Sequence, residues 1–139
     1  MDSKFIKICK GRNKAFKAIK KHALNTLKFT SLVIPSYDPD FEEKPKATVK
    51  TILDCLDYFE CQDISEKRVT DSKGKYLLSD KVFYFSGCID GITEITETII
   101  KSAENVLYGG ISYQIKSFRA VTQFFNGVTL WEIVAGGIK

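Results

Sequence analysis

At 139 residues the chain is long enough for one domain and too short for two well-packed ones, so we expect a single domain over residues 1–139. Its apolar content of 44% is ordinary for a globular protein and excludes a wholly disordered chain. The net charge of +4 is unevenly spread, because residues 1–28 hold nine Lys or Arg and one acid, whereas the remainder is net negative.

The composition also limits where the protein acts and what it binds. No run of about 18 apolar residues occurs, so no transmembrane helix or integral membrane anchor is expected. The lysines near the N-terminus are too closely spaced for the apolar part of a signal peptide, which indicates a cytosolic protein with reduced, mostly buried cysteines. With His22 as the only histidine and no CxxC, neither a metal site nor a cofactor is expected.

Helical spacing of apolar residues predicts helices in the first half of the chain. Residues 13–30 place Phe16, Ile19, Ala23 and Leu27 at spacings of three, four and four. Residues 35–46 contain all three prolines and are predicted to form a loop. Residues 47–62 have the cleanest amphipathic pattern of the chain and predict the next helix.

The same spacing continues through the middle of the chain. In residues 76–89 it favours a helix with an N-cap at Ser79-Asp80, although the cluster VFYF leaves a strand as the alternative. Residues 90–107 are rich in β-branched Ile and Thr, which slightly disfavour helix. Length and period nevertheless predict a helix that is apolar over most of its circumference, ended by Gly109-Gly110.

The last third of the chain predicts a helix over residues 111–125, a turn at Asn126-Gly127 and a short terminal helix containing Trp131. The chain is thus expected to hold six or so helices and no hairpin. The predicted fold class is all-α, a helical bundle with a central apolar helix wrapped by amphipathic ones.

Three stretches resemble the homology regions of the Bcl-2 family of apoptosis regulators. VKTILDCLDYFE (49–60) resembles the third region, and IDGITEITETII (89–100) resembles the first region at Asp90-Gly91. NGVTLWEIVAGG (126–137) resembles the second region, and nearly as well the first, but chain length favours the second. The short chain without a hydrophobic tail is similar to virus-encoded members of the iridovirus type.

The resemblance implies a Bcl-2-like helical bundle and a pro-survival, anti-apoptotic function. Such a protein sequesters the BH3 helix of Bim-like pro-apoptotic Bcl-2 proteins in an apolar groove, in the host cytoplasm or peripherally at mitochondria. The groove residues carried over are Ile52, Leu53, Leu56, Phe59, Val82, Phe83, Phe85, Gly91, Ile92 and Ile95. The family's arginine that pairs with the ligand's acid is absent, and Glu94 would repel that acid. A homodimer that covers the groove is a secondary expectation.

The two other classes of function are nucleic-acid or anionic-membrane binding and catalysis. Nucleic-acid or anionic-membrane binding through the basic first helix would use Lys14, Lys17, Lys20, Lys21 and Lys28. Few aromatic residues accompany these lysines, so the main expectation includes no nucleic-acid partner. We expect no enzyme and no catalytic residues, because one histidine builds no triad and Asp54 with Asp57 fits an exposed helix face.

Overall fold

The computed structural model describes residues 3–19, 26–33, 48–56, 58–89, 93–124 and 127–137. Most of them belong to one antiparallel sheet of seven strands in the order β2-β1-β7-β8-β9-β4-β3, with β5 and β6 forming a separate two-stranded sheet. The elements in chain order are α1 (Ser3–Ile19), β1 (Leu27–Val33), β2 (Thr48–Leu56), β3 (Phe59–Asp63), α2 (Glu66–Asp71), β4 (Lys81–Ser86), β5 (Cys88–Ile89), β6 (Thr93–Glu94), α3 (Glu97–Ser102), β7 (Asn105–Tyr108), β8 (Ile111–Phe124) and β9 (Gly127–Gly137).

The predicted all-α fold is therefore wrong, and with it the Bcl-2-like helical bundle. Within the predicted helix 47–62 the described residues form β2 and most of β3, and within the predicted helix 111–125 residues 111–124 form β8. The described part of the expected central helix, 90–107, holds the six-residue α3 between two short strands. The physical reason is that aromatic and β-branched side chains favour a pleated surface, and this preference outweighs a helical spacing that apolar-rich segments satisfy by chance.

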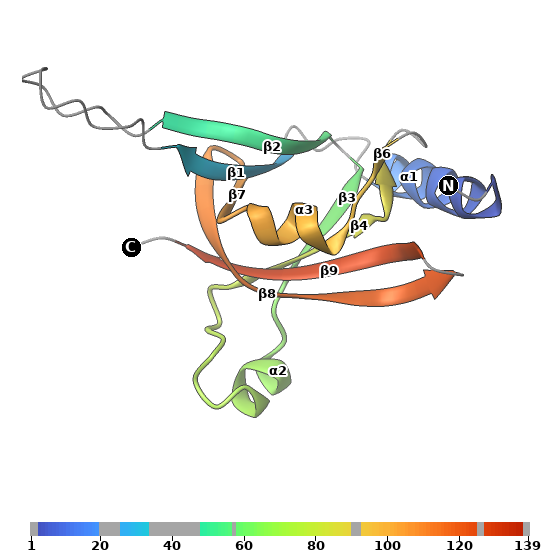
Figure 1. Ribbon diagram of the computed structural model, residues 1–139. Helices are drawn as coiled ribbons and strands as arrows, with labels where there is room; N and C mark the ends of the chain where they lie inside the picture. Colours follow the sequence, from blue (N-terminus) through green and yellow to red (C-terminus); the bar gives the residue numbers. More distant parts are fainter. Residues whose placement is uncertain are drawn as a thin grey trace, which may run out of the picture.

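The seven-stranded sheet curls around its own core, and α3 lies inside the curve (Figure 1). Four phenylalanines are almost fully buried there: Phe29, Phe59, Phe83 and Phe85. Phe29 and Phe85 meet edge to face with ring centroids 5.2 Å apart, a favourable geometry for aromatic pairs. Ile100 and Ala103 from the α3 segment complete this core, so α3 is held by apolar burial.

The opposite, convex face of the sheet is also covered. Alternate residues of a strand point to opposite faces, so Val82 and Ser86 of β4 point away from Phe83. Val82 packs with Ile64, at the start of the arm formed by residues 64–80, which carries α2. The Ser86 hydroxyl donates to Asn13 Oδ1 of α1 at 2.5 Å, so α1 covers the other end of this face.

Two hairpins connect the strands on either side of β8. Gly109 and Gly110 both have positive φ, +58° and +77°, which fits a two-residue turn between β7 and β8. β8 then pairs with β9 along its length, with register shifts on either side of residues 117–120. Within the described residues, no helix is long and apolar enough to cross a membrane.

Candidate functional site

The residues predicted to wall a ligand groove lie mostly in the core. Five of the ten are buried: Phe59, Val82, Phe83, Phe85 and Ile95. Ile52 and Leu53 on β2 are half-buried against the same core. The side chain of Leu56 is not described, and Gly91 and Ile92 lie outside the described residues. The structure thus brings most of this set together as core packing, although Ile95 also lines one of the hollows described below.

The edge of β8 is the clearest place in the described fold where a strand lacks a pairing neighbour. β7 pairs only with residues 111–114 of this 14-residue strand, while β9 pairs with it from Tyr113 onward. One further bond on the β7 side joins the Ile115 N–H to the Glu104 carbonyl at 3.2 Å. From Lys116 to Gln123, no described strand pairs with β8 on the side away from β9.

The edge is open because the chain that precedes β7 turns inward. Thr96 caps α3, with its hydroxyl oxygen accepting from the Ile99 N–H at 3.4 Å. The helix then buries Ile100 in the core instead of continuing as a strand beside β8. Residues 94–105 therefore face the second half of β8 across a gap, and hollows occupy that gap.

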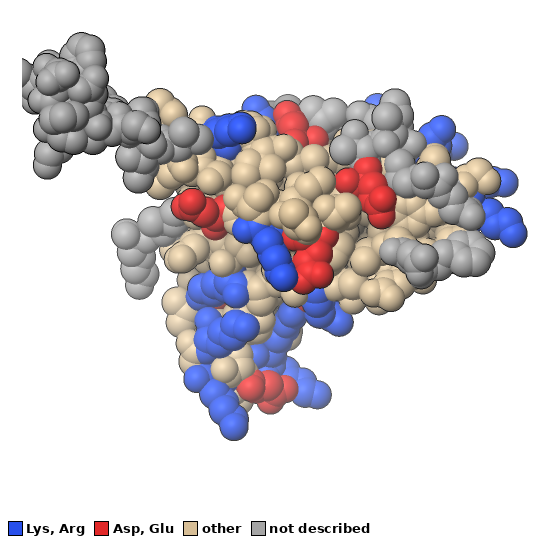
Figure 2. Space-filling model, in the orientation of Figure 1, with Lys and Arg blue, Asp and Glu red and all other residues tan. Residues whose placement is uncertain are grey.

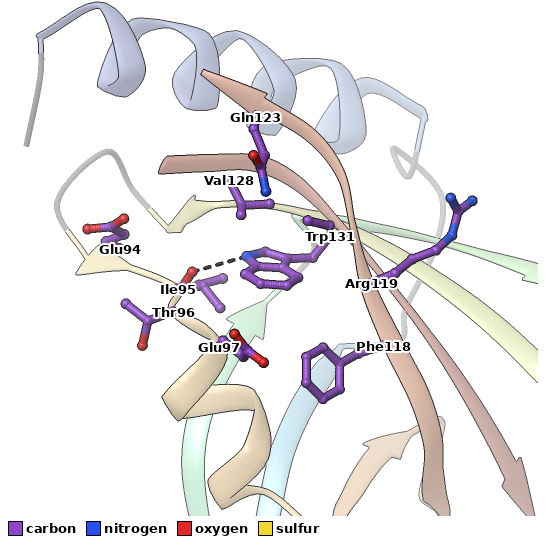
Figure 3. A pocket seen from close by; sticks show the side chains of 10 residues that line it. Glu94, Ile95, Thr96, Glu97, Phe118, Arg119, Gln123, Val128 and Trp131 are labelled. Carbon is purple, nitrogen blue, oxygen red and sulfur yellow. Dashed lines mark hydrogen bonds between the residues drawn. The ribbon is translucent and has the colours of Figure 1, made fainter. Parts of the chain in front are cut away.

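The first hollow, which we call the Trp131 hollow, has a volume of about 430 Å³. It is lined by Glu94, Ile95, Thr96, Glu97, Phe118, Arg119, Ala120, Gln123, Val128 and Trp131. Trp131 is fixed by a hydrogen bond from its Nε1 to the Ile95 carbonyl at 3.0 Å and by an edge contact with Phe118 (Figure 3). This hollow combines rigid aromatic walls with polar groups, as small binding sites commonly do.

The second hollow, the Ile115 hollow, has a volume of about 640 Å³ and adjoins the first at Phe118, which lines both. Its lining comprises Lys75, Ile100, Lys101, Ala103, Glu104, Asn105, Gln114, Ile115, Lys116, Ser117 and Phe118. The two hollows and the unpaired edge of residues 116–123 together form what we call the β8 trench.

Charge differs between the two ends of the β8 trench. Glu94 and Glu97 stand at the Trp131 hollow, whereas the Ile115 hollow is lined by Lys75, Lys101 and Lys116 together with Glu104. Lys116 pairs with Asp80 at 2.7 Å. The basic side continues into the arm around α2, where lysines and arginines gather (Figure 2). Lys101 and Glu97 pair at 3.0 Å where the two ends meet, so the asymmetry is strongest toward the outer ends.

An ion cluster on the convex face fixes the strand behind the β8 trench. Glu132 of β9 accepts from Arg119 of β8 at 2.9 and 3.2 Å and from Arg68 of α2 at 2.5 Å. Burial alone would raise the pKa of Glu132, but hydrogen bonds from Arg68, Arg119 and Tyr84 outweigh it and hold the pKa at about 2. Arg119 accordingly points away from the Trp131 hollow (Figure 3).

Neither an acid–base pair nor a metal centre emerges from this part of the chain. Glu132 is 1% exposed, ionised and fully engaged, which suits a structural ion cluster rather than proton transfer. Among the described residues no group of His, Cys, Asp and Glu is placed to hold a metal ion. Cys9, Cys55 and Cys88 are buried and Cys61 is half-buried, which confirms the expectation that the cysteines are mostly buried. Burial raises the pKa of the Cys9 thiol to about 11.

The sequence prediction missed the trench because it missed the strands that build it. One signal was present, since Asn126-Gly127 stands between two apolar runs, the strongest short-range mark of a hairpin. No known protein family and no curated protein matches this chain. We therefore infer the function from the geometry of the trench.

Proposed function

We propose that this protein is an interaction module that binds an extended segment of a partner protein along the β8 trench. The observation that carries the proposal is the run from Lys116 to Gln123, which no described strand pairs on the side away from β9, with a hollow beside each half. A strand edge of this kind offers main-chain donors and acceptors to an added strand, and pockets for alternate side chains supply specificity.

The dimensions suit a short peptide. Eight residues of strand span roughly 26 Å at about 3.3 Å per residue. The register shifts restrict regular strand geometry to Ser117–Ala120. We therefore expect a few main-chain hydrogen bonds between these residues and the peptide, and less regular contacts on either side of them. Two peptide side chains four residues apart, roughly 13 Å, share one face of a strand and would enter the two hollows.

Charge gives the bound segment a direction. A strand that pairs antiparallel to β8 has its N-terminal part at the Trp131 hollow and its C-terminal part at the Ile115 hollow. Glu94 and Glu97 then favour a basic residue early in the peptide, while Lys75 favours an acidic residue later, because Lys116 already pairs with Asp80 at 2.7 Å. The proposed ligand is an extended segment with an aromatic or aliphatic anchor between a basic and an acidic residue.

The pro-survival function stays a prediction, as do the homodimer and the location at mitochondria. The residues expected to wall a groove for a BH3 helix lie mostly in the core, so no described feature supports capture in that form. A BH3 peptide therefore belongs in the test as a competing ligand.

The test is selection of peptides from a displayed random library against the purified chain, followed by titration of synthetic hits. Trp131 is the only tryptophan, so its fluorescence reports occupancy of its hollow directly. Gln123→Tyr partly fills that hollow, and Gln62→Tyr is the matched control because Gln62 is an exposed glutamine on β3. We expect Gln123→Tyr to weaken binding at least tenfold and Gln62→Tyr to leave it unchanged.

Equal affinity for both variants, or hits that bind without changing the tryptophan signal, would contradict the trench. Tight binding of a BH3 helix that stays helical when bound would instead favour the pro-survival prediction.

A further inference from the structure

Helix α1 carries two opposite stripes of side chains. The buried stripe packs against the sheet and consists of Phe5, Cys9, Asn13 and Phe16. The exposed stripe consists of Lys7, Lys10, Lys14 and Lys17, at spacings of three, four and three. Helical geometry places these lysines along about 15 Å of the axis, roughly the axial length of four phosphates of a nucleic-acid strand.

The positive charge of this stripe is not compensated. Helix α1 contains no acidic residue, and none of these four lysines has an ion-pair partner among the described residues. Its other exposed positions are charged, polar or small: Ser3, Lys4, Gly11, Ala15 and Ala18. Phe5, Cys9 and Phe16 are buried and Ile6 and Ile8 are half-buried, so the described exposed positions of α1 carry no large apolar side chain to insert into a lipid bilayer.

A hollow of about 290 Å³, the Tyr58 hollow, opens beside the lysine stripe. It is lined by Lys10, Asn13, Lys14, Lys17 and Tyr58. Asn13 is a fixed wall, because its amide donates to the Cys88 carbonyl at 2.8 Å and its oxygen accepts from Ser86. Tyr58 is held at the start of β3 by packing against the main core.

We infer that the lysine stripe and the Tyr58 hollow bind single-stranded nucleic acid. The lysines contact successive phosphates, and the Tyr58 ring stacks on one base that enters the hollow. A volume near 300 Å³ lies at the lower end of ligand sites and suits one nucleotide. A cationic track beside an aromatic ring is the usual arrangement for single strands, whose bases are free to leave the stack, whereas a duplex keeps its bases paired.

This site differs from the one expected from the sequence. Lys14 and Lys17 are shared, but Lys20 and Lys21 lie outside the described residues and Lys28 is half-buried on β1. Lys7 and Lys10 take their place, and the aromatic partner that the sequence did not reveal is Tyr58 from a distant part of the chain.

The test measures binding of a labelled 20-nucleotide oligothymidine to the full chain by fluorescence anisotropy over a range of salt. Four phosphate contacts on a single strand predict a slope of log K against log salt of about −2.8. Binding should therefore weaken roughly fifty-fold between 50 and 200 mM salt. A duplex of the same length should bind more weakly at every salt concentration.

The decisive variant combines Lys10→Gln, Lys14→Gln and Lys17→Gln, and should reduce the slope to about −0.7. Its control combines Lys50→Gln, Lys67→Gln and Lys73→Gln, which removes the same charge from exposed positions elsewhere and should leave the slope unchanged. Tyr58→Leu should weaken single-strand binding about tenfold without changing the slope, because stacking carries no charge. A circular dichroism melt verifies that each variant is folded.

Three results would overturn the inference. The first is an equal effect of the two triple variants, which would make the binding a matter of net charge alone. The second is duplex binding as tight as single-strand binding. The third is binding only to vesicles of phosphatidylcholine and phosphatidylserine, with none to the oligonucleotide.

Discussion

Replacing Glu132 by glutamine tests the ion cluster that ties the arm, β9 and β8 together. Glu132 is 1% exposed and accepts hydrogen bonds from Arg68 and Arg119. Glutamine keeps the size of the side chain but removes its charge, so Glu132→Gln isolates the electrostatic contribution. Because the Arg119 side chain ties β8 to Glu132 of β9 behind the Trp131 hollow, the same cluster also holds this part of the β8 trench in place.

The structure sets the size of the effect. The pKa of Glu132 is lowered from 4.5 to about 2, and at about 1.4 kcal/mol per pKa unit this corresponds to roughly 3 kcal/mol of stability at pH 7. Removing one partner of a buried ion pair typically costs about 3–5 kcal/mol. The side chains of Arg68 and Arg119 are 29% and 60% exposed, so water can solvate them once the carboxylate is removed. We therefore expect a cost at or just below the lower end of that range, about 2–3 kcal/mol.

The pH dependence follows from the direction of the shift. Because the folded-state pKa is lowered, the contribution is fully present above about pH 4.5 and is lost as pH falls toward 2. Urea denaturation of the wild type and of Glu132→Gln should show a gap of about 2–3 kcal/mol at pH 7 that shrinks to roughly half at pH 3.

Glu97→Gln is the matched control for this measurement. Glu97 pairs with Lys101 one helical turn away, and both side chains are more than half exposed, so the change should cost less than about 0.5 kcal/mol. The reasoning fails if Glu132→Gln also costs less than about 0.5 kcal/mol at pH 7, or if its gap to the wild type is the same at pH 3.

Three further predictions concern packing and thiols. Gly87→Ala places a Cβ 1.6 Å from a main-chain oxygen and should destabilise the fold by about 3 kcal/mol or more. Gly11→Ala meets no atom within 4 Å and should raise the melting temperature. Equal melting temperatures for the two variants would refute the close packing at Gly87. Trp131→Phe loses the hydrogen bond of the indole, so the free energy of unfolding should fall by about 1–3 kcal/mol, and an unchanged urea midpoint would argue against that bond. In the native protein Cys61 should react first with a thiol reagent and Cys55 only after unfolding, and the reverse order would contradict their burial.

The sequence predicted part of helix α1 and the position of the glycine turn. It did not predict that this turn joins two strands. Phe16 is buried on one face of α1 as expected, although the helix spans residues 3–19 rather than 13–30. Gly109 and Gly110 do adopt positive φ, but they join two strands instead of ending a helix. Glycine marks the backbone conformation, and only the neighbouring elements decide whether the turn caps a helix or closes a hairpin.

The strands escaped prediction because several are buried on both faces. In β9, Trp131, Ile133 and Ala135 face the concave core, while Glu132 and Val134 are covered by the arm. A strand covered on both faces shows no clean alternation of apolar and polar residues, so its period cannot be told from that of a helix. The β-branched residues and the Asn-Gly turn were the better guides.

The candidate site could not be predicted for a different reason. The β8 trench exists because α3 turns inward, so that no described strand lies beside residues 116–123 on the side away from β9, and such an absence has no residue pattern of its own. The Tyr58 hollow likewise joins α1 to a residue about forty positions away. Phe118 and Gln123 can be recognised as candidate site residues only once the sheet order is known.

Amide hydrogen–deuterium exchange, with and without a peptide selected for binding, tests the central claim most directly. Strand addition at the open edge predicts slower exchange in residues 116–123 of β8 when the peptide is bound, with β2 and α1 unchanged. Slower exchange confined to another edge or to α1, with β8 unaffected, would show that the partner binds elsewhere and would contradict the proposal.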